Sequence, residues 1–355
     1  MSRKLLSYTA LGLILGNAAI ADVPKVAVDI SPVHSLVSRV MEGVGSPKLI
    51  IPAGASPHEY SLRPSEAKSL QDADMVIWMG EDLAPWMENS IEKLAKNAEI
   101  ITLLEISETK LLDYREGALF EEHDHGDHDD HDKDHDDHDD HDDHDDHDHD
   151  KDHDDHDDHD DHDDHDHDKD HDDHDDHDDH AGHDHGEHDP HAWLSLENAQ
   201  TWLNLVAGKL SAADPENAGV YFGNAAAARS EIEELSKEVN SILDPVRGRS
   251  FVVFHDAYQY FETSFDFPAS GAISLGDATD PSASRIAEIQ GRVREEGISC
   301  VLSEPQYNPN LVATVLEGTD AKTGVIDPLG VNLEPGPKLY GDLIRNMAKS
   351  LAGCL

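Results

Sequence analysis

The chain has 355 residues and carries 77 Asp and Glu against 26 Lys and Arg, a formal net charge of −51. Nucleic acids and anionic membrane surfaces attract proteins through Lys and Arg, so this charge excludes both as partners. The excess is local, because residues 121–189 hold 36 Asp, 3 Glu and 3 Lys, a net of −36, which leaves −15 elsewhere. That segment also holds 23 of the 27 histidines, and the four others are His34, His58, His191 and His255.

The N-terminus has the three parts of a secretory signal peptide. A basic start, Met-Ser-Arg-Lys, precedes a short apolar run from Leu5 to Leu15, and small residues end the segment from Ala19 to Ala21. The alternative is a membrane anchor, but the apolar run is well short of the roughly 20 residues that span a bilayer. We expect cleavage after Ala21 and a mature protein in the periplasm.

Strand-like and helical stretches alternate on both sides of the acidic segment. The expected strands are 26–30, 48–51, 75–79, 99–104, 251–254, 269–273, 298–302 and 324–326, and the expected helices are 34–44, 64–73, 83–95, 282–296, 309–318 and 337–351. This alternation predicts the α/β class, with parallel sheets flanked by helices.

A long stretch without strand character, 214–243, lies between the two halves. It opens with Asp214-Pro215, a typical N-cap and first helical residue, and is rich in Ala, Glu and Lys. We expect one long helix to join two lobes. The predicted organisation is a signal peptide at 1–21, an N-terminal metal-binding lobe at 22–212, a linker helix at 213–245 and a C-terminal metal-binding lobe at 246–355.

The acidic segment 121–189 is a low-complexity repeat of His-Asp-Asp, with Lys133, Lys151 and Lys169 recurring 18 residues apart. It has almost no apolar side chains to bury and its aspartates repel one another, so we expect disorder. Imidazoles and carboxylates both bind divalent metals, which predicts weak, multiple metal binding by an insert that collects or buffers metal. The alternative is a solvated polyanionic linker.

The periplasm tolerates disulfides, so Cys300 and Cys354 are expected to form a bridge between a strand and the C-terminal helix. Closing a loop of this length contributes roughly 4 kcal/mol in the chain-entropy model. The alternative is a pair of unpaired buried thiols.

Three of the four remaining histidines lie at plausible ligand positions, and two of them, His58 and His255, lie beyond the carboxyl ends of expected strands, where ligands bind in parallel sheets. His58 follows an expected strand in a Gly-, Pro- and Ser-rich loop, His255 ends the run Phe251–Phe254, and His191 follows the insert beside Trp193. Three neutral imidazoles suit a tetrahedral zinc ion.

Carboxylates next to two of these histidines are candidates for holding the rings in orientation. Asp189 is near His191, and Asp256 directly follows His255. His34, in contrast, lies at the start of an expected helix, and we interpret it as a structural residue.

Several segments resemble the solute-binding proteins of zinc-uptake ABC transporters, the ZnuA type of periplasmic metal-binding protein. The resemblance covers essentially the whole mature chain, including an acidic His-rich insert before the second histidine. The matching segments are 54–65, 189–194, 254–261, 303–306 and 326–330.

The resemblance implies two lobes bridged by a rigid helix, a zinc ion held by His58, His191 and His255, and a disulfide such as Cys300–Cys354. It also implies a monomer that delivers zinc to an ABC permease in the inner membrane. The manganese-binding branch has a carboxylate where His255 falls, and imidazole-rich sites favour zinc over manganese.

The fourth ligand stays open at this point. Some zinc-binding members carry an acidic residue directly before the first histidine, where this chain has Pro57. Asp327 matches a carboxylate ligand of other branches, and a water molecule is the equal alternative. Glu59 and Glu304 are weaker candidates, and Glu304 also suits an orienting role.

Two other functions compete with delivery to a transporter. Three histidines and a water molecule also build a catalytic zinc, as in a hydrolase or hydratase. The sequence lacks His-Glu-x-x-His and Gly-x-Ser-x-Gly, so we predict that the protein is not an enzyme. The second competitor is a periplasmic zinc buffer without a transporter partner.

Overall fold

The computed structural model describes residues 23–115, 120, 188–274, 281–307 and 309–355. The expected cleavage site after Ala21 lies outside this part of the chain. So does the predicted disorder of 121–189, except at its last two residues, His188 and Asp189.

The first sheet is parallel, with strand order β2-β1-β3-β4. Its strands are β1 (Val26–Val28), β2 (Lys48–Leu49), β3 (Met75–Trp78) and β4 (Glu99–Thr102). The two central strands, β1 and β3, are buried throughout, as their continuous apolar sequences require of strands covered on both faces. Helices α1 (Ser31–Val40), α2 (Pro64–Gln71) and α3 (Pro85–Leu94) accompany this sheet, and each has a proline in its first turn.

The second sheet repeats the same order with the later strands, β6-β5-β7-β8, and is again parallel. Its strands are β5 (Phe251–His255), β6 (Ala272–Ser274), β7 (Cys300–Ser303) and β8 (Lys322–Val325). Its helices are α6 (Gln259–Phe265), α7 (Ala283–Glu295) and α8 (Pro309–Leu316). The predicted α/β class is therefore confirmed for both halves.

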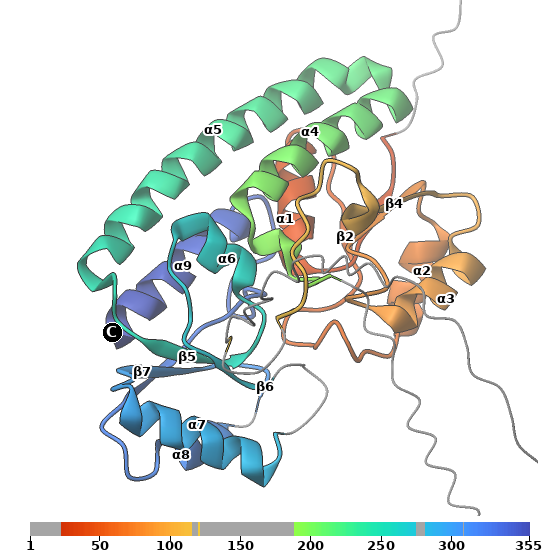
Figure 1. The fold of residues 1–355 in the computed structure, drawn as a ribbon. Helices are drawn as coiled ribbons and strands as arrows, with labels where there is room; N and C mark the ends of the chain where they lie inside the picture. The colour runs from red at the N-terminus through yellow and green to blue at the C-terminus, as the bar shows by residue number, and fades with distance from the viewer. Residues whose placement is uncertain (1–22, 116–119, 121–187, 275–280, 308) are drawn as a thin grey trace, which may run out of the picture. The chain divides into compact units, whose positions relative to one another are not determined.

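The predicted long helix between the sheets is confirmed as α5 (Ala218–Leu243). In the described part of this stretch a second α-helix, α4 (Leu196–Ala213), precedes α5 and packs along it (Figure 1). The sequence contains a start signal for α4, the N-cap residue Ser195. In the structure its hydroxyl accepts a hydrogen bond from the backbone N–H of Asn198.

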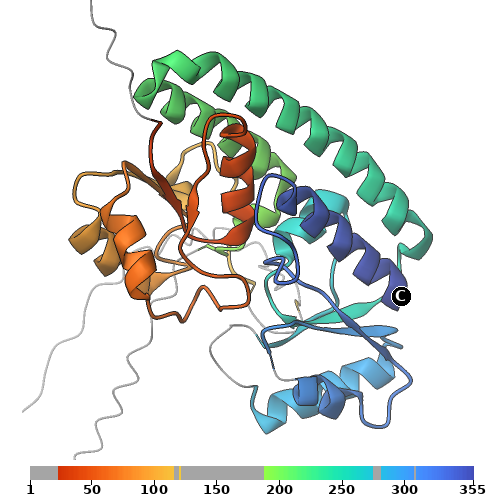
Figure 2. The same ribbon diagram turned by 180° about the vertical axis from the view of Figure 1, so that it is seen from behind.

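The C-terminal helix α9 (Leu339–Cys354) packs against both α5 and α1. Figure 2 shows α9 and α1 beneath the length of α5. One continuous apolar core runs from the first sheet through α4, α5 and α9 to one face of the second sheet, and a smaller core lies between the second sheet and α7 and α8. The long helix is therefore packed into the structure along one side, which limits bending at this connection.

The predicted disulfide is present. Cys300, the first residue of β7, is bonded to Cys354, the last residue of α9. The bridge closes a loop with a sequence separation of 54, for which the chain-entropy model gives about 4 kcal/mol. It ties the second sheet to the helical layer that also covers the first.

None of the helices within the described residues has both the length and the apolar character needed to cross a lipid bilayer.

A buried aspartate holds the central strands of the first sheet together at their carboxyl ends. Asp29 follows β1 and is fully buried, and its carboxylate accepts hydrogen bonds from the backbone N–H of Ile30 at 2.7 Å and of Met79 at 2.7 Å. Burial raises the pKa of Asp29 to about 7, although the two backbone donors partly oppose this shift. In the unfolded chain the same carboxyl group ionises near pH 3.8.

This difference predicts that the stability contribution of Asp29 falls as the pH rises from about 4 to about 7. Between these values the folded protein binds a proton that the unfolded chain has lost, so unfolding becomes easier with increasing pH. The full loss is on the order of 4 kcal/mol. Urea unfolding of the metal-free protein and of Asp29→Asn at pH 5, 6, 7 and 8 measures it. The stability difference between the two proteins should change with pH, and parallel curves would contradict the assignment.

Candidate metal centre

His58 lies in the loop between β2 and α2, beyond the carboxyl end of the strand. The backbone N–H of His58 donates to the hydroxyl of Ser56 at 3.3 Å. The indole N–H of Trp86, in α3, donates to the carbonyl of Pro57 at 2.8 Å. Gly54 adopts φ +88°, a left-handed conformation that suits glycine, so the chain can turn back before the histidine. The loop is thus fastened directly before His58.

His191 is held by a single buried carboxylate. The Oδ1 atom of Asp189 lies 2.7 Å from Nδ1 of the His191 ring. It also accepts a hydrogen bond from the backbone N–H of His191 at 2.9 Å. Both side chains are buried. A carboxylate only accepts hydrogen bonds, so Nδ1 carries the proton and Nε2 is the atom available for a metal. The sequence prediction for Asp189 therefore agrees with its observed position.

His255 is oriented in the same way, by a residue from the neighbouring strand. It is the last residue of β5, and its Nδ1 lies 2.6 Å from Oε1 of Glu304, which directly follows β7. Because β5 and β7 pair in parallel, their carboxyl ends bring these two buried side chains together. The Nε2 atom of His255 is again the available metal ligand.

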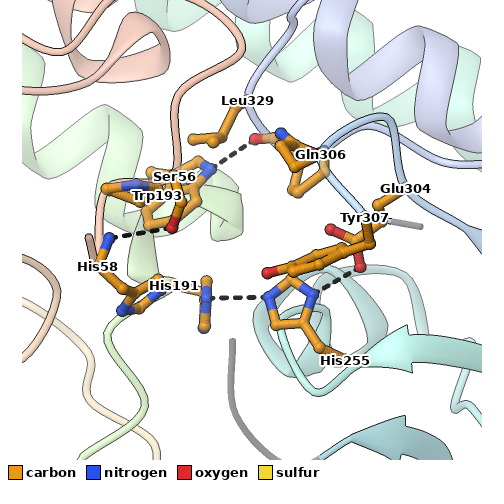
Figure 3. Close-up of a pocket in the computed structure, with 11 residues that line it drawn as sticks. Ser56, His58, His191, Trp193, His255, Glu304, Gln306, Tyr307 and Leu329 are labelled. Atoms are coloured by element: carbon orange, nitrogen blue, oxygen red, sulfur yellow. Dashed lines mark hydrogen bonds and ion pairs between the residues drawn. The ribbon is translucent and has the colours of Figure 1, made fainter. Parts of the chain in front are cut away.

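The three histidines converge on one pocket, which is also lined by Trp193, Glu304 and Tyr307. Figure 3 shows His58 and His191 on one side, facing His255, Glu304 and Tyr307 on the other. The Nε2 atoms of His191 and His255 are 3.4 Å apart, and the ring centroids of His58 and His191 are 5.7 Å apart.

Two nitrogens bound to one tetrahedral zinc at about 2.05 Å lie about 3.3 Å apart, so the His191–His255 pair already has the required spacing. The ring centroids of His58 and His191 are about as far apart as those of His191 and His255, at 5.7 Å and 5.3 Å. Among the described residues, however, no group of three or more His, Cys, Asp and Glu side chains is arranged so that it could hold a metal ion.

Aromatic side chains surround the histidines and limit access of water. Trp193 packs against the His191 ring at 5.2 Å between centroids, and Tyr307 packs edge-on against His255 at 5.5 Å. The Trp193 indole is fixed by a hydrogen bond to the carbonyl of Pro328 at 2.9 Å. Tyr258 also packs against His255, and burial raises the pKa of its hydroxyl well above the ordinary value, so it stays neutral.

Two residues proposed from the sequence have other contacts. Asp256 points to Arg115, with Oδ2 accepting from Nε at 3.0 Å, whereas Glu304 is the residue observed at the His255 ring. Asp327 follows β8, and its carboxylate accepts the backbone N–H groups of the three residues 329–331 at 2.7 to 3.1 Å. The pocket lining includes its neighbours Pro328 and Leu329.

His34 is the structural residue that the sequence predicts. It is buried in α1, where Nε2 lies 3.3 Å from the carbonyl of Pro47 and Nδ1 lies 3.5 Å from the hydroxyl of Ser38. Burial lowers its pKa, which favours the neutral ring.

Sequence reasoning named Glu304 for an orienting role but did not assign it to His255, and it did not find Arg115. The signal for Glu304 was available, because it follows an expected strand as His58 and His255 do. Arg115 had no such signal, since it precedes the acidic segment without any recognisable motif, and only the folded chain brings it next to Asp256.

Residues 26–354 match the family described as "Zinc-uptake complex component A periplasmic". The chain belongs to this family. It is 44% identical over 353 residues to the high-affinity zinc uptake system protein ZnuA of Paracoccus denitrificans, covering 98% of each chain. The protein of the same name from Brucella abortus is 44% identical over 340 residues, with 96% of this chain and 94% of the relative covered.

The fold is also that of a solved structure, "Crystal structure of ZnuA". The two superpose with a TM-score of 0.66 at 17% identity, over 94% of this chain and 99% of the other.

We predict that the two carboxylates tune metal affinity through the rings that they hold. Asp189→Asn and Glu304→Gln keep the side-chain size but remove the negative charge behind each imidazole. Each variant should weaken zinc binding about 10- to 100-fold, as measured by competition with a chromophoric chelator. Glu231→Gln, a substitution on the exposed face of α5, is the control and should bind as the wild type does. Unchanged affinity in both variants would contradict the orienting role.

Proposed function

We propose that this chain captures Zn²⁺ in the periplasm and delivers it to an ABC permease for import. Its family is described as a periplasmic component of a zinc-uptake complex, which supports a role in transport. The proposed ligands are His58, His191 and His255, and zinc is the cargo of the protein.

The observation that carries this proposal is the pairing of His191 and His255. Their Nε2 atoms lie 3.4 Å apart, and a buried carboxylate is bonded to the opposite nitrogen of each ring. Hydrogen bonding to the carboxylate fixes the tautomer and increases the basicity of the ligand nitrogen. Two such imidazoles meeting at one point support a binding site for a cation.

The chemistry of the ligands supports zinc as that cation. Imidazole nitrogens suit zinc, whereas manganese favours carboxylate and water oxygens. Among the described residues the pocket lining offers three imidazoles and the carboxylate of Glu304, which is already bonded to His255.

For the fourth position we propose a water molecule in preference to Asp327. The carboxylate of Asp327 already supports its loop through three backbone N–H groups, and binding zinc would disturb this arrangement. Gly330 in that loop adopts φ +73°, and its backbone N–H donates a hydrogen bond to the Asp327 carboxylate. The loop therefore depends on the aspartate for its own conformation.

The proposed mechanism needs little domain motion. The two sheets share the helical layer of α4, α5 and α9, and a continuous apolar core joins them. Such packing opposes the large hinge bending that loops permit, so we expect zinc to bind with small adjustments of loops and rings. Docking of both lobes on the permease would then allow the ion to leave.

The two alternatives receive less support. A hydrolase or hydratase would need room for a substrate beside the zinc, whereas the pocket here, lined by Trp193, Tyr307 and Leu329, is small, and the family points to transport. A zinc buffer without a transporter differs only in its partner. Growth of a deletion strain in zinc-limited medium, rescued by this gene only when the permease is present, separates delivery from buffering.

We predict that each proposed histidine is required for a single tight zinc-binding event. Titration of Zn²⁺ into the metal-free mature protein should show this event in the wild type. It should disappear in His58→Ala, His191→Ala and His255→Ala, because two imidazoles do not hold zinc tightly. His34→Ala is the matched control, since that buried histidine lies outside the pocket. Persistence of the tight event in any of the three variants would remove that residue from the ligand set.

The same titration assigns the fourth position. If water is the ligand, Asp327→Asn retains the tight event with an affinity close to that of the wild type. A loss comparable to that of the histidine variants would instead make Asp327 the ligand.

Replacing residues 121–187 with a short Gly-Ser linker should leave the tight site intact and lower the total number of zinc ions bound. The replacement must stop before His188 and Asp189, because Asp189 holds the His191 ring. Weak sites in the insert would raise the local zinc concentration near the strong one, so uptake at low zinc should also slow. Loss of the tight event in this variant would contradict the proposed division of roles.

A further inference from the structure

The two segments that flank residues 121–187 in the sequence contact each other beside the pocket. Asp113 and His188 form an antiparallel bridge, and His188 Nδ1 lies 2.9 Å from Asp113 Oδ1. The backbone N–H of Asp189 donates to the carbonyl of Leu112 at 2.8 Å. We call residues 110–115 together with 188–189 the insert stem. The stem includes the carboxylate that orients His191.

Helix α6, which follows His255 in the chain, contacts this stem through Tyr260. The hydroxyl of Tyr260 accepts the backbone N–H of Leu112 at 2.9 Å and donates to the carbonyl of Asp189 at 2.9 Å. One phenol therefore binds both strands of the stem. The stem connects the segment that carries His191 to the segment that carries His255.

Arg115 is the charged part of the same connection. Its Nε donates to Asp256 at 3.0 Å and its Nη2 binds the other oxygen of that carboxylate. Its Nη1 donates to Glu262 at 2.7 Å. The ring of Phe120, 3.5 Å from the guanidinium carbon, covers the arginine. A planar guanidinium is suited to binding two carboxylates at once, and lysine is not equivalent to it here.

The cluster is shielded from water, which makes its geometry restrictive. The side chains of Arg115, Asp256 and Glu262 are 16%, 6% and 5% exposed. Burial opposes the charge on the guanidinium, but the hydrogen bonds to the two carboxylates outweigh it and raise the pKa of Arg115. Without the arginine, two carboxylates would face each other in a buried position, and at least one would have to move or bind a proton, which changes the hydrogen bonds of the cluster.

Asp256 is directly attached to His255, so a movement of this carboxylate shifts the end of β5. On the opposite side, the stem that carries Arg115 also carries Asp189, which holds His191. Both histidine positions thus depend on the same three-residue cluster, and the 3.4 Å spacing of their Nε2 atoms depends on both.

We propose that Arg115 is a positioning residue of the zinc site, which sets the spacing of His191 and His255 by fastening the insert stem to Asp256 and Glu262. The proposal rests on the proposed function, because it assumes that these histidines bind zinc. It assigns the stem a role in the tight site, separate from the weak metal binding proposed for the acidic segment that the stem carries.

The test compares Arg115→Ala, Arg115→Lys and a matched control, Arg39→Ala. Arg39 has the same exposed fraction, 16%, and also binds two carboxylates, Glu42 and Glu231, but it lies in α1. The full mature chain is used for every variant. The measurements are the Zn²⁺ dissociation constant and the visible absorption of the Co²⁺-loaded protein, which reports the coordination geometry of the metal.

We expect Arg115→Ala to raise the Zn²⁺ dissociation constant about 10- to 100-fold and to shift or weaken the cobalt absorption bands. Arg115→Lys should recover part of the affinity, because it restores the charge without the two-sided contact. Arg39→Ala should match the wild type in both measurements, whatever its effect on the melting temperature.

Wild-type affinity and a wild-type cobalt spectrum in Arg115→Ala, with only a lower melting temperature, would overturn the proposal and leave the arginine a purely structural role.

If Arg115→Ala does not fold, Glu262→Gln tests the proposal in its place. This variant removes one charge without a change in size, and it should weaken zinc binding in the same direction, whereas unchanged affinity and spectrum would overturn the proposal. Absence of tight zinc binding in the wild type would instead refute the proposed function itself.

Discussion

The site depends on hydrogen bonding between buried carboxylates and imidazoles. Asp189 holds the ring of His191 and Glu304 holds the ring of His255, each at the nitrogen that faces away from the other histidine. Neither carboxylate would be stable at these positions without a donor, and neither ring would keep its orientation without an acceptor. The pairing therefore supports the fold and prepares the Nε2 atoms for a metal.

The two sheets have the same strand order, and they use equivalent positions differently. In the first sheet, Asp29 at the end of β1 bonds to the backbone of Met79 after β3. In the second, His255 at the end of β5 bonds to Glu304 after β7. Each contact joins the two central strands at their carboxyl ends. In one lobe the contact is only structural, whereas in the other it also orients a proposed zinc ligand.

The helical layer and the insert stem connect the lobes at different places. Helices α4, α5 and α9 cover one side, and the disulfide between Cys300 and Cys354 fastens β7 to the last of them. The stem adds a polar connection close to the pocket through Tyr260 and Arg115. A site built from residues far apart in the sequence needs such connections, because a shift of about 1 Å between the lobes would separate the proposed ligand nitrogens.

The sequence by itself determined the alternation of strands and helices, the three histidines beyond strand ends and at the end of the insert, and the structural character of His34. These features follow from apolar periodicity and from the topology of parallel sheets, which place strand ends along one edge. Only the tertiary structure decided which carboxylate serves which ring. Asp256 is adjacent to His255 in the chain, yet Glu304 is bonded to the ring, because pairing of β5 and β7 brings residues 49 positions apart into contact. Helix α6, the loop contacts of Asp327 and the Arg115 cluster were likewise set by packing between distant segments, for which a single sequence carries no local signal.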